Sequence, residues 1–195
     1  MIEWLILSIL LASSIISLII YTLSVLPVTL GEKYGKDYFK RCATFRRISL
    51  VFWILMMACY LAYFFIPIPI TIPLFLDYQI SLFTGIIMLV VGIGITIKGE
   101  MDVGEETAGP YKKTDLVTTG IYQYFRHPQT IGEIIALFGL TFILGSFFLI
   151  LISLIAIPGF AIVIYFEEKD LVKRFGEKYK EYQKRVGIFF PKRKN

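Results

Sequence analysis

The residues best suited to chemistry lie where a polar segment re-enters a long apolar stretch. The chain has one histidine, and it stands in the run Arg126-His127-Pro128. An imidazole titrates near neutral pH and forms hydrogen bonds, so it can hold a ligand or move a proton. At a polar–apolar boundary such a ring needs a polar partner. A functional site, if the chain has one, is therefore predicted at His127.

Acidic residues mark the same region. Glu133 is the one charge within residues 129–166, and Glu167 and Glu168 follow directly. An acid inside a membrane segment is a functional candidate by default. However, Thr130 and Glu133 have the spacing of a helix capping box, which is our preferred interpretation of Glu133.

Each group also has a purely structural alternative. Arg126 and His127 could reach lipid head groups from a helix end. Tyr122 could belong to the aromatic belt of a membrane interface, and the two glutamates could be ordinary interfacial charges. Residue type and position alone leave these alternatives open.

Membrane helices must position these residues. The chain has 195 residues, of which 56% are hydrophobic and 18% charged, and its mean hydropathy is +0.71. Soluble domains are about a quarter charged, and a membrane span needs about 20 apolar residues. We therefore predict an all-α integral membrane protein with a single domain over residues 1–195. Its five transmembrane helices are expected at residues 2–30, 48–66, 80–97, 129–143 and 147–166.

Glycines and prolines indicate where these spans end and where they approach one another. The prolines of residues 67–73 predict one turn, and Gly145 predicts the turn between the last two spans. Gly85, Gly92 and Gly94 indicate places where another helix, or alternatively a ligand, approaches the backbone closely.

The basic residues predict the topology. All 20 Lys and Arg fall into three segments, with six in residues 31–47, four in 98–126 and ten in 169–194. Five spans place all three on one side, which the positive-inside rule assigns to the cytosol, with the N-terminus outside. The first span is too long for a signal peptide and should persist in the mature chain. The expected location is the cytoplasmic membrane of a prokaryote or the endoplasmic reticulum of a eukaryote.

The cytosolic parts are expected to bind a cofactor between residues 98–128 and 167–190. The first part is rich in glycine and could wrap a ligand, although a flexible connection is the alternative. The second is predicted to be an amphipathic helix at the membrane surface, or else a docked surface helix. Its apolar face comprises Leu171, Phe175, Tyr179, Tyr182 and Val186. Membrane lipids are expected partners, and nucleic acid is not, because no nucleic-acid motif is present.

Metal chemistry is not expected. The chain has two cysteines, Cys42 and Cys59, and their different predicted depths argue against a disulfide between them. One histidine without a cysteine cluster cannot supply the usual zinc ligands.

The order of these motifs resembles the isoprenylcysteine carboxyl methyltransferase family and, more distantly, the membrane phospholipid methyltransferases. The resemblance covers about the last 90 residues, whereas residues 1–97 match only as membrane helices. The shared pattern reads Leu116-Val117-x-x-Gly120-x-Tyr122, Arg126-His127-Pro128, Glu167-Glu168 and Phe175-Gly176-x-x-Tyr179-x-x-Tyr182.

The resemblance implies S-adenosylmethionine as methyl donor and S-adenosylhomocysteine as product. It implies catalytic roles for Arg126 and Glu167, the latter accepting from the donor's amino group or ribose, or pairing with Arg126. A cation is favoured over an aromatic ring such as that of Tyr122 by about 1–2 kcal/mol when desolvated. The implied donor-binding residues are Lys113, Leu116, Val117, Gly120, Tyr122, His127, Pro128, Thr130 and Glu167.

The scarcity of proton acceptors favours a carboxylate as methyl acceptor. A carboxylate has a pKa of about 4 and is already ionised at neutral pH, whereas a phospholipid amine must first lose a proton. The predicted substrate is therefore a lipophilic or prenylated molecule with an isoprenylcysteine-like carboxylate. The alternatives are a phospholipid or other isoprenoid methyltransferase, an NADPH-dependent membrane reductase and a membrane protein without enzymatic activity.

The chain departs from the family at one position. Eukaryotic members carry an arginine about one turn before the glutamate pair, associated with the substrate carboxylate, and the matching residue here is Val163. Arg46, Arg47 and Arg126 are candidates to replace it, and the sequence leaves the acceptor and the oligomeric state open.

Overall fold

The structure is a computed structural model, and it describes residues 1–35, 38–66, 70, 74, 76–103, 115–190 and 192. In these residues the chain is helical, with one isolated bridge between Phe125 and Gly187 and no strand. The α-helices are α1 (Ile2–Ser24), α2 (Pro27–Tyr34), α3 (Tyr38–Ala62), α4 (Tyr78–Val103), α5 (Pro128–Ile143), α6 (Phe147–Phe175) and α7 (Glu177–Arg185), and Gly120–Gln123 form a 3₁₀ turn, η2. The predicted all-α class is confirmed.

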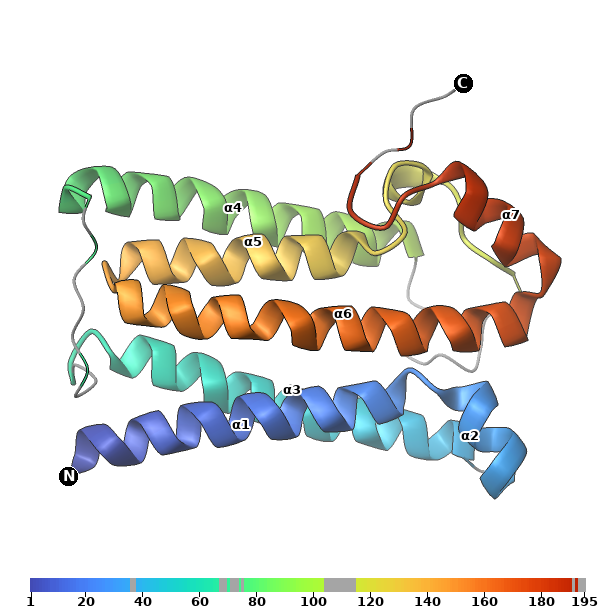
Figure 1. The fold of residues 1–195 in the computed structure, drawn as a ribbon, viewed down its shortest axis with the longest axis horizontal. Helices are drawn as coiled ribbons and strands as arrows, with labels where there is room; N and C mark the ends of the chain where they lie inside the picture. Colours follow the sequence, from blue (N-terminus) through green and yellow to red (C-terminus); the bar gives the residue numbers. More distant parts are fainter. Residues whose placement is uncertain are drawn as a thin grey trace.

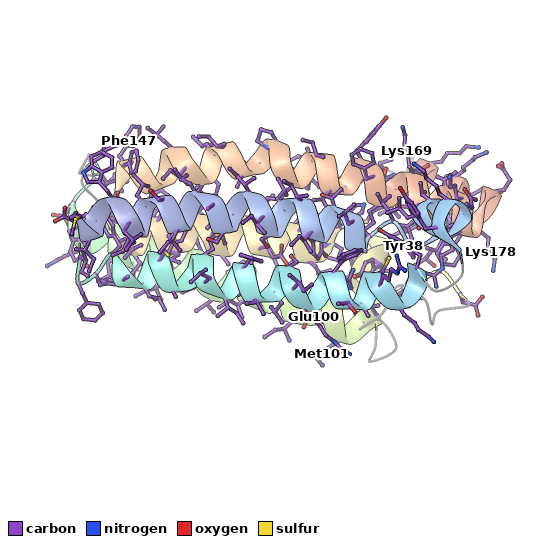
Figure 2. The ribbon with its side chains drawn as sticks, turned by 90° about the horizontal axis from the view of Figure 1, so that it is seen from below. Tyr38, Glu100, Met101, Phe147, Lys169 and Lys178 are labelled. Atoms are coloured by element: carbon purple, nitrogen blue, oxygen red, sulfur yellow. The ribbon has the colours of Figure 1, made fainter. Side chains whose placement is uncertain are left out.

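The long helices lie side by side in one elongated bundle (Figure 1). Helix α3 packs along α1, α5 packs along α4, and α6 contacts both α5 and α1. Successive long helices run in opposite directions, so α2, the end of α4, η2 and α7 gather at one end (Figure 1). Lys169 and Lys178 lie at that end and Phe147 lies at the other (Figure 2). The described parts of the three basic segments therefore share one end, as the topology requires.

Four helices are long and apolar enough to cross a membrane. They are Ile2–Ser24, Lys40–Ala62, Tyr78–Val103 and Phe147–Phe175, and they make the chain an integral membrane protein. The apolar helix α5 has 16 residues, which at 1.5 Å per residue is about 24 Å, less than the roughly 30 Å of a bilayer core. The structure therefore supports four of the five predicted spans outright.

Two predicted helix boundaries are wrong. The first span does not reach residue 30, because α1 ends at Ser24 and Pro27 opens the separate helix α2. Proline has no amide donor for the preceding turn but fits the first position of a new helix. The tail is also not one helix, because α6 continues to Phe175 and Gly176, with φ of 57°, begins a second helix.

Glycines let α4 and α5 approach each other closely. A Cβ on Gly92 would lie 2.5 Å from the amide nitrogen of Ala136 and 2.6 Å from the carbonyl oxygen of Gly132. Gly85 faces Gly139 in the same way, so the predicted close approach is confirmed at both positions. It is wrong for Gly94, around which the space is open. The predicted turn at Gly145 is confirmed, with φ of 62°, whereas most of the proline run lies outside the described residues.

A buried carboxylate holds α2 against α6. Asp170 is 2% exposed, and its oxygens accept hydrogen bonds from the backbone amides of Val28 (3.3 Å) and Thr29 (2.7 Å). We expect Asp170→Ala to lower the free energy of unfolding by about 1–3 kcal/mol, because it removes the acceptor of two helix-start amides. Thermal unfolding in detergent measures this loss. The exposed Asp115→Ala is the control, and equal stability of the two variants would contradict the anchoring role.

Candidate active site

The predicted site residues meet at the end of the bundle that carries the basic segments. His127 precedes the first turn of α5, and its side chain is 7% exposed. The two glutamates reach it from α6. His127 Nδ1 lies 3.5 Å from Glu167 Oε2, and His127 Nε2 lies 3.3 Å from Glu168 Oε1. The imidazole is therefore held between two carboxylates.

Glu168 joins three elements at this point. Its Oε1 pairs with Arg126 Nε at 2.7 Å and accepts a hydrogen bond from the Tyr179 hydroxyl at 3.3 Å, in addition to its contact with His127. Its Oε2 accepts from the side-chain amide of Gln183 at 3.1 Å. One carboxylate on α6 thus fixes the loop before α5 and one face of α7. Of the alternatives given for Glu167, pairing with Arg126 is wrong, because Arg126 pairs with the neighbouring Glu168.

Arg126 also fastens the end of α7. Its Nη1 donates to the carbonyl oxygens of Gln183 (3.1 Å) and Val186 (3.0 Å), and its backbone amide donates to the carbonyl of Gly187 (3.0 Å). A guanidinium suits these positions because the last carbonyls of a helix lack intrahelical donors and carry partial negative charge. The contacts of Arg126 indicate that it positions the site.

His127 carries a positive charge at neutral pH. Burial opposes this charge, but hydrogen bonds and attraction from Glu167 and Glu168 outweigh it and raise the pKa of His127 to about 9. An imidazole that already holds its proton cannot serve as a general base at pH 7. The chain has no second histidine to take that role.

The pH dependence of stability reports this charge. Because the pKa of His127 rises on folding from 6.5 to about 9, its stabilisation is complete below the lower value and is lost as the pH rises through the higher one. We expect the unfolding temperature in detergent to fall over this interval more steeply in the wild type than in His127→Gln. Equal slopes in the two proteins would contradict a charged His127.

The loop before His127 is held from both sides. Asp102, on the last turn of α4, accepts from the backbone amide of Ile121 at 2.7 Å, next to Gly120 with its φ of 62°. The hydroxyl of Tyr182 donates to the carbonyl oxygen of Tyr122 at 2.5 Å. Burial raises the pKa of Tyr182, so this hydroxyl keeps the proton that it donates. The turn that carries Tyr122 is therefore held from α4 and from α7.

An apolar cluster closes the site on the α7 side. Tyr179, Tyr182 and Val186 are buried, and Leu116 packs against them. The predicted apolar face of the tail is thus confirmed, although two helices carry it: Leu171, Val172 and Phe175 contribute from α6.

The structure tests several individual predictions. Lys113 lies outside the described residues. The capping box is wrong, because α5 begins at Pro128 after His127, so Thr130 lies inside the first turn and Glu133 farther along. Val163 is buried at 3% exposure.

Three contributing residues were not predicted as site residues: Glu168, Asp102 and Gln183. The pair Glu167-Glu168 in the sequence was a signal for Glu168. Asp102 and Gln183 act through contacts distant in sequence, for which no local pattern exists.

The arrangement has the features that S-adenosylmethionine requires. Its sulfonium and amino group are cationic, and Glu167 has His127 as its one ion-pair partner among the described residues while 30% of its side chain stays exposed. Tyr122, Leu116 and Val117 are only partly buried, so aromatic and apolar surface remains for an adenine and a sulfonium. The residues present therefore fit this cofactor.

Comparison with known proteins agrees with this site. A family model described as phospholipid methyltransferase matches residues 80–178. The matched segment contains α5, α6 and all but the first two residues of α4, and it includes Arg126, His127 and both glutamates.

Three relatives have names that specify a reaction. The chain is 43% identical over 77 residues to protein-S-isoprenylcysteine O-methyltransferase of Schizosaccharomyces pombe (39% of this chain, 33% of the relative). It is 32% identical over 93 residues to methanethiol S-methyltransferase 1 of Bradyrhizobium diazoefficiens (48% and 30%). It is 34% identical over 84 residues to protein-S-isoprenylcysteine O-methyltransferase of Tribolium castaneum (39% and 27%).

These alignments cover a third or less of the length of the curated relatives. No solved structure matches the chain significantly. The family model, however, covers about half of the chain and runs through the glutamates and the histidine. The chain therefore belongs to the phospholipid methyltransferase family, and the predicted resemblance to isoprenylcysteine methyltransferases is confirmed.

Proposed function

We propose that this protein transfers a methyl group from S-adenosylmethionine to the carboxylate of a lipophilic, isoprenylcysteine-like acceptor. The single observation that carries the proposal is the buried His127 held between Glu167 and Glu168, whose carboxylates raise the pKa of the imidazole to about 9. Such an arrangement can hold a polar ligand, but it cannot take a proton from the acceptor. A carboxylate is the acceptor that requires no proton removal.

The proposed donor site would combine two polar side chains with a group of aromatic and apolar ones. Glu167 would accept from the amino group or a ribose hydroxyl, and His127 would donate to the polar end of the donor. Tyr122 would face the sulfonium, while Leu116 and Val117 would border the adenine. Bound there, the donor supplies an electrophilic methyl group.

The remaining predicted residues would support this site. Gly120 and Pro128 shape the loop and the start of α5, and Lys113 and Thr130 stay predicted donor contacts. We propose Arg126 as a positioning residue, because its contacts to Glu168 and to the end of α7 explain its burial. Alignment of acceptor and methyl group is the first requirement of an in-line displacement, and this rigid frame would provide it.

The proposed orientation places the site at the cytosolic membrane surface. Helix α5 would cross the bilayer as a fifth span, because it lies between α4 and α6 and connects the same two ends of the bundle (Figure 1). The basic end would face the cytosol and the N-terminus would lie outside. The donor would then enter from the cytosol, and the acceptor would enter from the bilayer.

A thiol is the second candidate acceptor, because one relative is named methanethiol S-methyltransferase 1. A thiol has an ordinary pKa of about 8.5 and would have to lose its proton. The protonated His127 does not favour this reaction. The same reasoning applies to a phospholipid amine.

Calorimetric titration in detergent with S-adenosylhomocysteine and, separately, NADPH tests the donor class. We expect micromolar-range binding of the first, weakened in Glu167→Ala and His127→Ala, and no binding of NADPH. Glu181→Gln, on the outer surface of α7, is the control. Binding of NADPH alone would support the membrane reductase, and binding of neither ligand would refute the methyl-donor site.

A further inference from the structure

Arg46 is a partly buried cation that the proposed mechanism does not use. It lies on α3, inside the segment Lys40–Ala62 that can span the membrane. Its guanidinium carbon is 5.5 Å from the centroid of the Tyr21 ring on α1. Its Nε is buried and has no hydrogen-bond partner in the described part of the chain. Because a buried charged donor without an acceptor is costly, this side chain needs an anionic or polar partner.

The nearby acids do not supply that partner. Glu133 on α5 and Glu167 on α6 attract Arg46 electrostatically. Yet no described carboxylate forms an ion pair with it, and Glu167 pairs with His127. Arg46 therefore faces the same region as the candidate site, from the side of α1 and α3, with hydrogen-bonding capacity left over.

The other arginines near this end differ from Arg46. The guanidinium of Arg126 is engaged by Glu168 and by carbonyls at the end of α7. Arg47, the next residue on α3, is exposed. The Nε atoms of Arg46 and Arg126 are both buried without a hydrogen bond in the described structure. Arg126 Nε, however, lies 2.7 Å from Glu168 Oε1, whereas no described carboxylate forms an ion pair with Arg46.

The position of Arg46 in the chain separates it from the donor-binding residues. The family match begins at residue 80, after both Tyr21 and Arg46. Methyltransferases that share a donor and differ in acceptor need their common residues for the donor and other residues for the acceptor. A ligand-binding residue on α3 is therefore better suited to the acceptor.

We propose that Arg46 binds the anionic group of the methyl acceptor, with its guanidinium stacked over Tyr21. A guanidinium forms two parallel hydrogen bonds with a carboxylate, and stacking on an aromatic ring fixes its plane. The acceptor's lipophilic part would then lie among the apolar residues of the spans. This inference rests on the proposed function and identifies the residue that selects for a charged acceptor.

Methyl-transfer kinetics with N-acetyl-S-farnesylcysteine test the proposal in the full-length protein in detergent. We expect Arg46→Gln to raise KM for this acid about 10- to 100-fold, as loss of a charged hydrogen bond predicts. Inhibition by the neutral methyl ester and the affinity for S-adenosylhomocysteine should stay within about twofold. Arg46→Lys should give a smaller rise in KM, because lysine keeps the positive charge but cannot form two parallel hydrogen bonds with a carboxylate. Arg47→Gln is the control and should match the wild type.

Each other outcome has a definite meaning. An unchanged KM, or inhibition by the ester that weakens in step with the acid, would overturn the role of Arg46. So would loss of S-adenosylhomocysteine binding in both Arg46 variants, which would assign the residue to the donor side or to folding. A wild type that binds S-adenosylhomocysteine but methylates only uncharged acceptors would overturn this inference and leave the donor site intact. A wild type that binds no S-adenosylhomocysteine would instead refute the proposed function.

Discussion

Glu168→Ala is expected to lower the free energy of unfolding by about 3–5 kcal/mol and to abolish donor binding. The substitution removes the carboxylate that the buried Arg126 and His127 side chains share. Arg126 is 7% exposed and Glu168 is 15% exposed, so water cannot replace the missing carboxylate at little cost. Tyr179 and Gln183 would lose their acceptor as well. Helix α7 should therefore detach from α6.

Two measurements resolve this effect. Thermal unfolding in detergent gives the loss of stability, and limited proteolysis after the lysines of α7 reports its detachment. Glu32→Gln is the matched control, since Glu32 pairs with Lys173 on the surface and both side chains are substantially exposed. An exposed ion pair contributes little, so this variant should behave as the wild type. If α7 resists proteolysis in Glu168→Ala as well as in the control, Glu168 does not hold α7 against α6, which would contradict this account.

Gly92→Ala should have the second large effect, because α4 and α5 have no room for a methyl group between them. The added Cβ would lie 2.5 Å from a backbone nitrogen of α5, which cannot move as a flexible side chain can. Forcing the helices apart should cost about 1–3 kcal/mol or more, and it would also shift residues 115–127, which lead into α5 at the site. We therefore expect both a lower unfolding temperature and weaker binding of S-adenosylhomocysteine.

Gly94→Ala is the control for this experiment. The site of its Cβ is open, and alanine favours a helix over glycine by about 0.5–1 kcal/mol. Gly94→Ala should therefore be as stable as the wild type or more stable. Equal loss of stability in the two variants would show that helix propensity or the membrane environment, and not the contact with α5, decides the outcome.

The parts of the fold that depend on local composition could be predicted from the sequence. Apolar length located the four helices that can cross a membrane, and Gly145 located the tight turn before α6. The end of α1 was misplaced because residues 25–30 remain apolar enough to extend a span. Pro27 begins α2 as a separate helix, and the contact of Asp170 with the amides of Val28 and Thr29, which lie far from it in sequence, holds that helix in place.

The candidate site, like the fold, could be predicted from the sequence only in part. The motif order brought His127 and the glutamate pair together correctly, because the family pattern encodes a shared site. It could not decide which glutamate meets Arg126, since adjacent residues on a helix point about 100° apart and the orientation of α6 is set by packing. The partners Asp102 and Gln183 and the environment of Arg46 likewise depend on contacts between distant helices, for which one sequence gives no local signal.

The most direct test of the proposed activity is transfer of a radiolabelled methyl group from S-adenosylmethionine to N-acetyl-S-farnesylcysteine by the purified protein. The proposed function predicts label in a product that releases methanol on mild base treatment, as a carboxyl ester does. It also predicts loss of this label in Glu167→Ala and retention in Glu181→Gln. Label that resists base, as in an S- or N-methyl product, or no transfer by a protein that binds S-adenosylhomocysteine, would contradict carboxyl methylation.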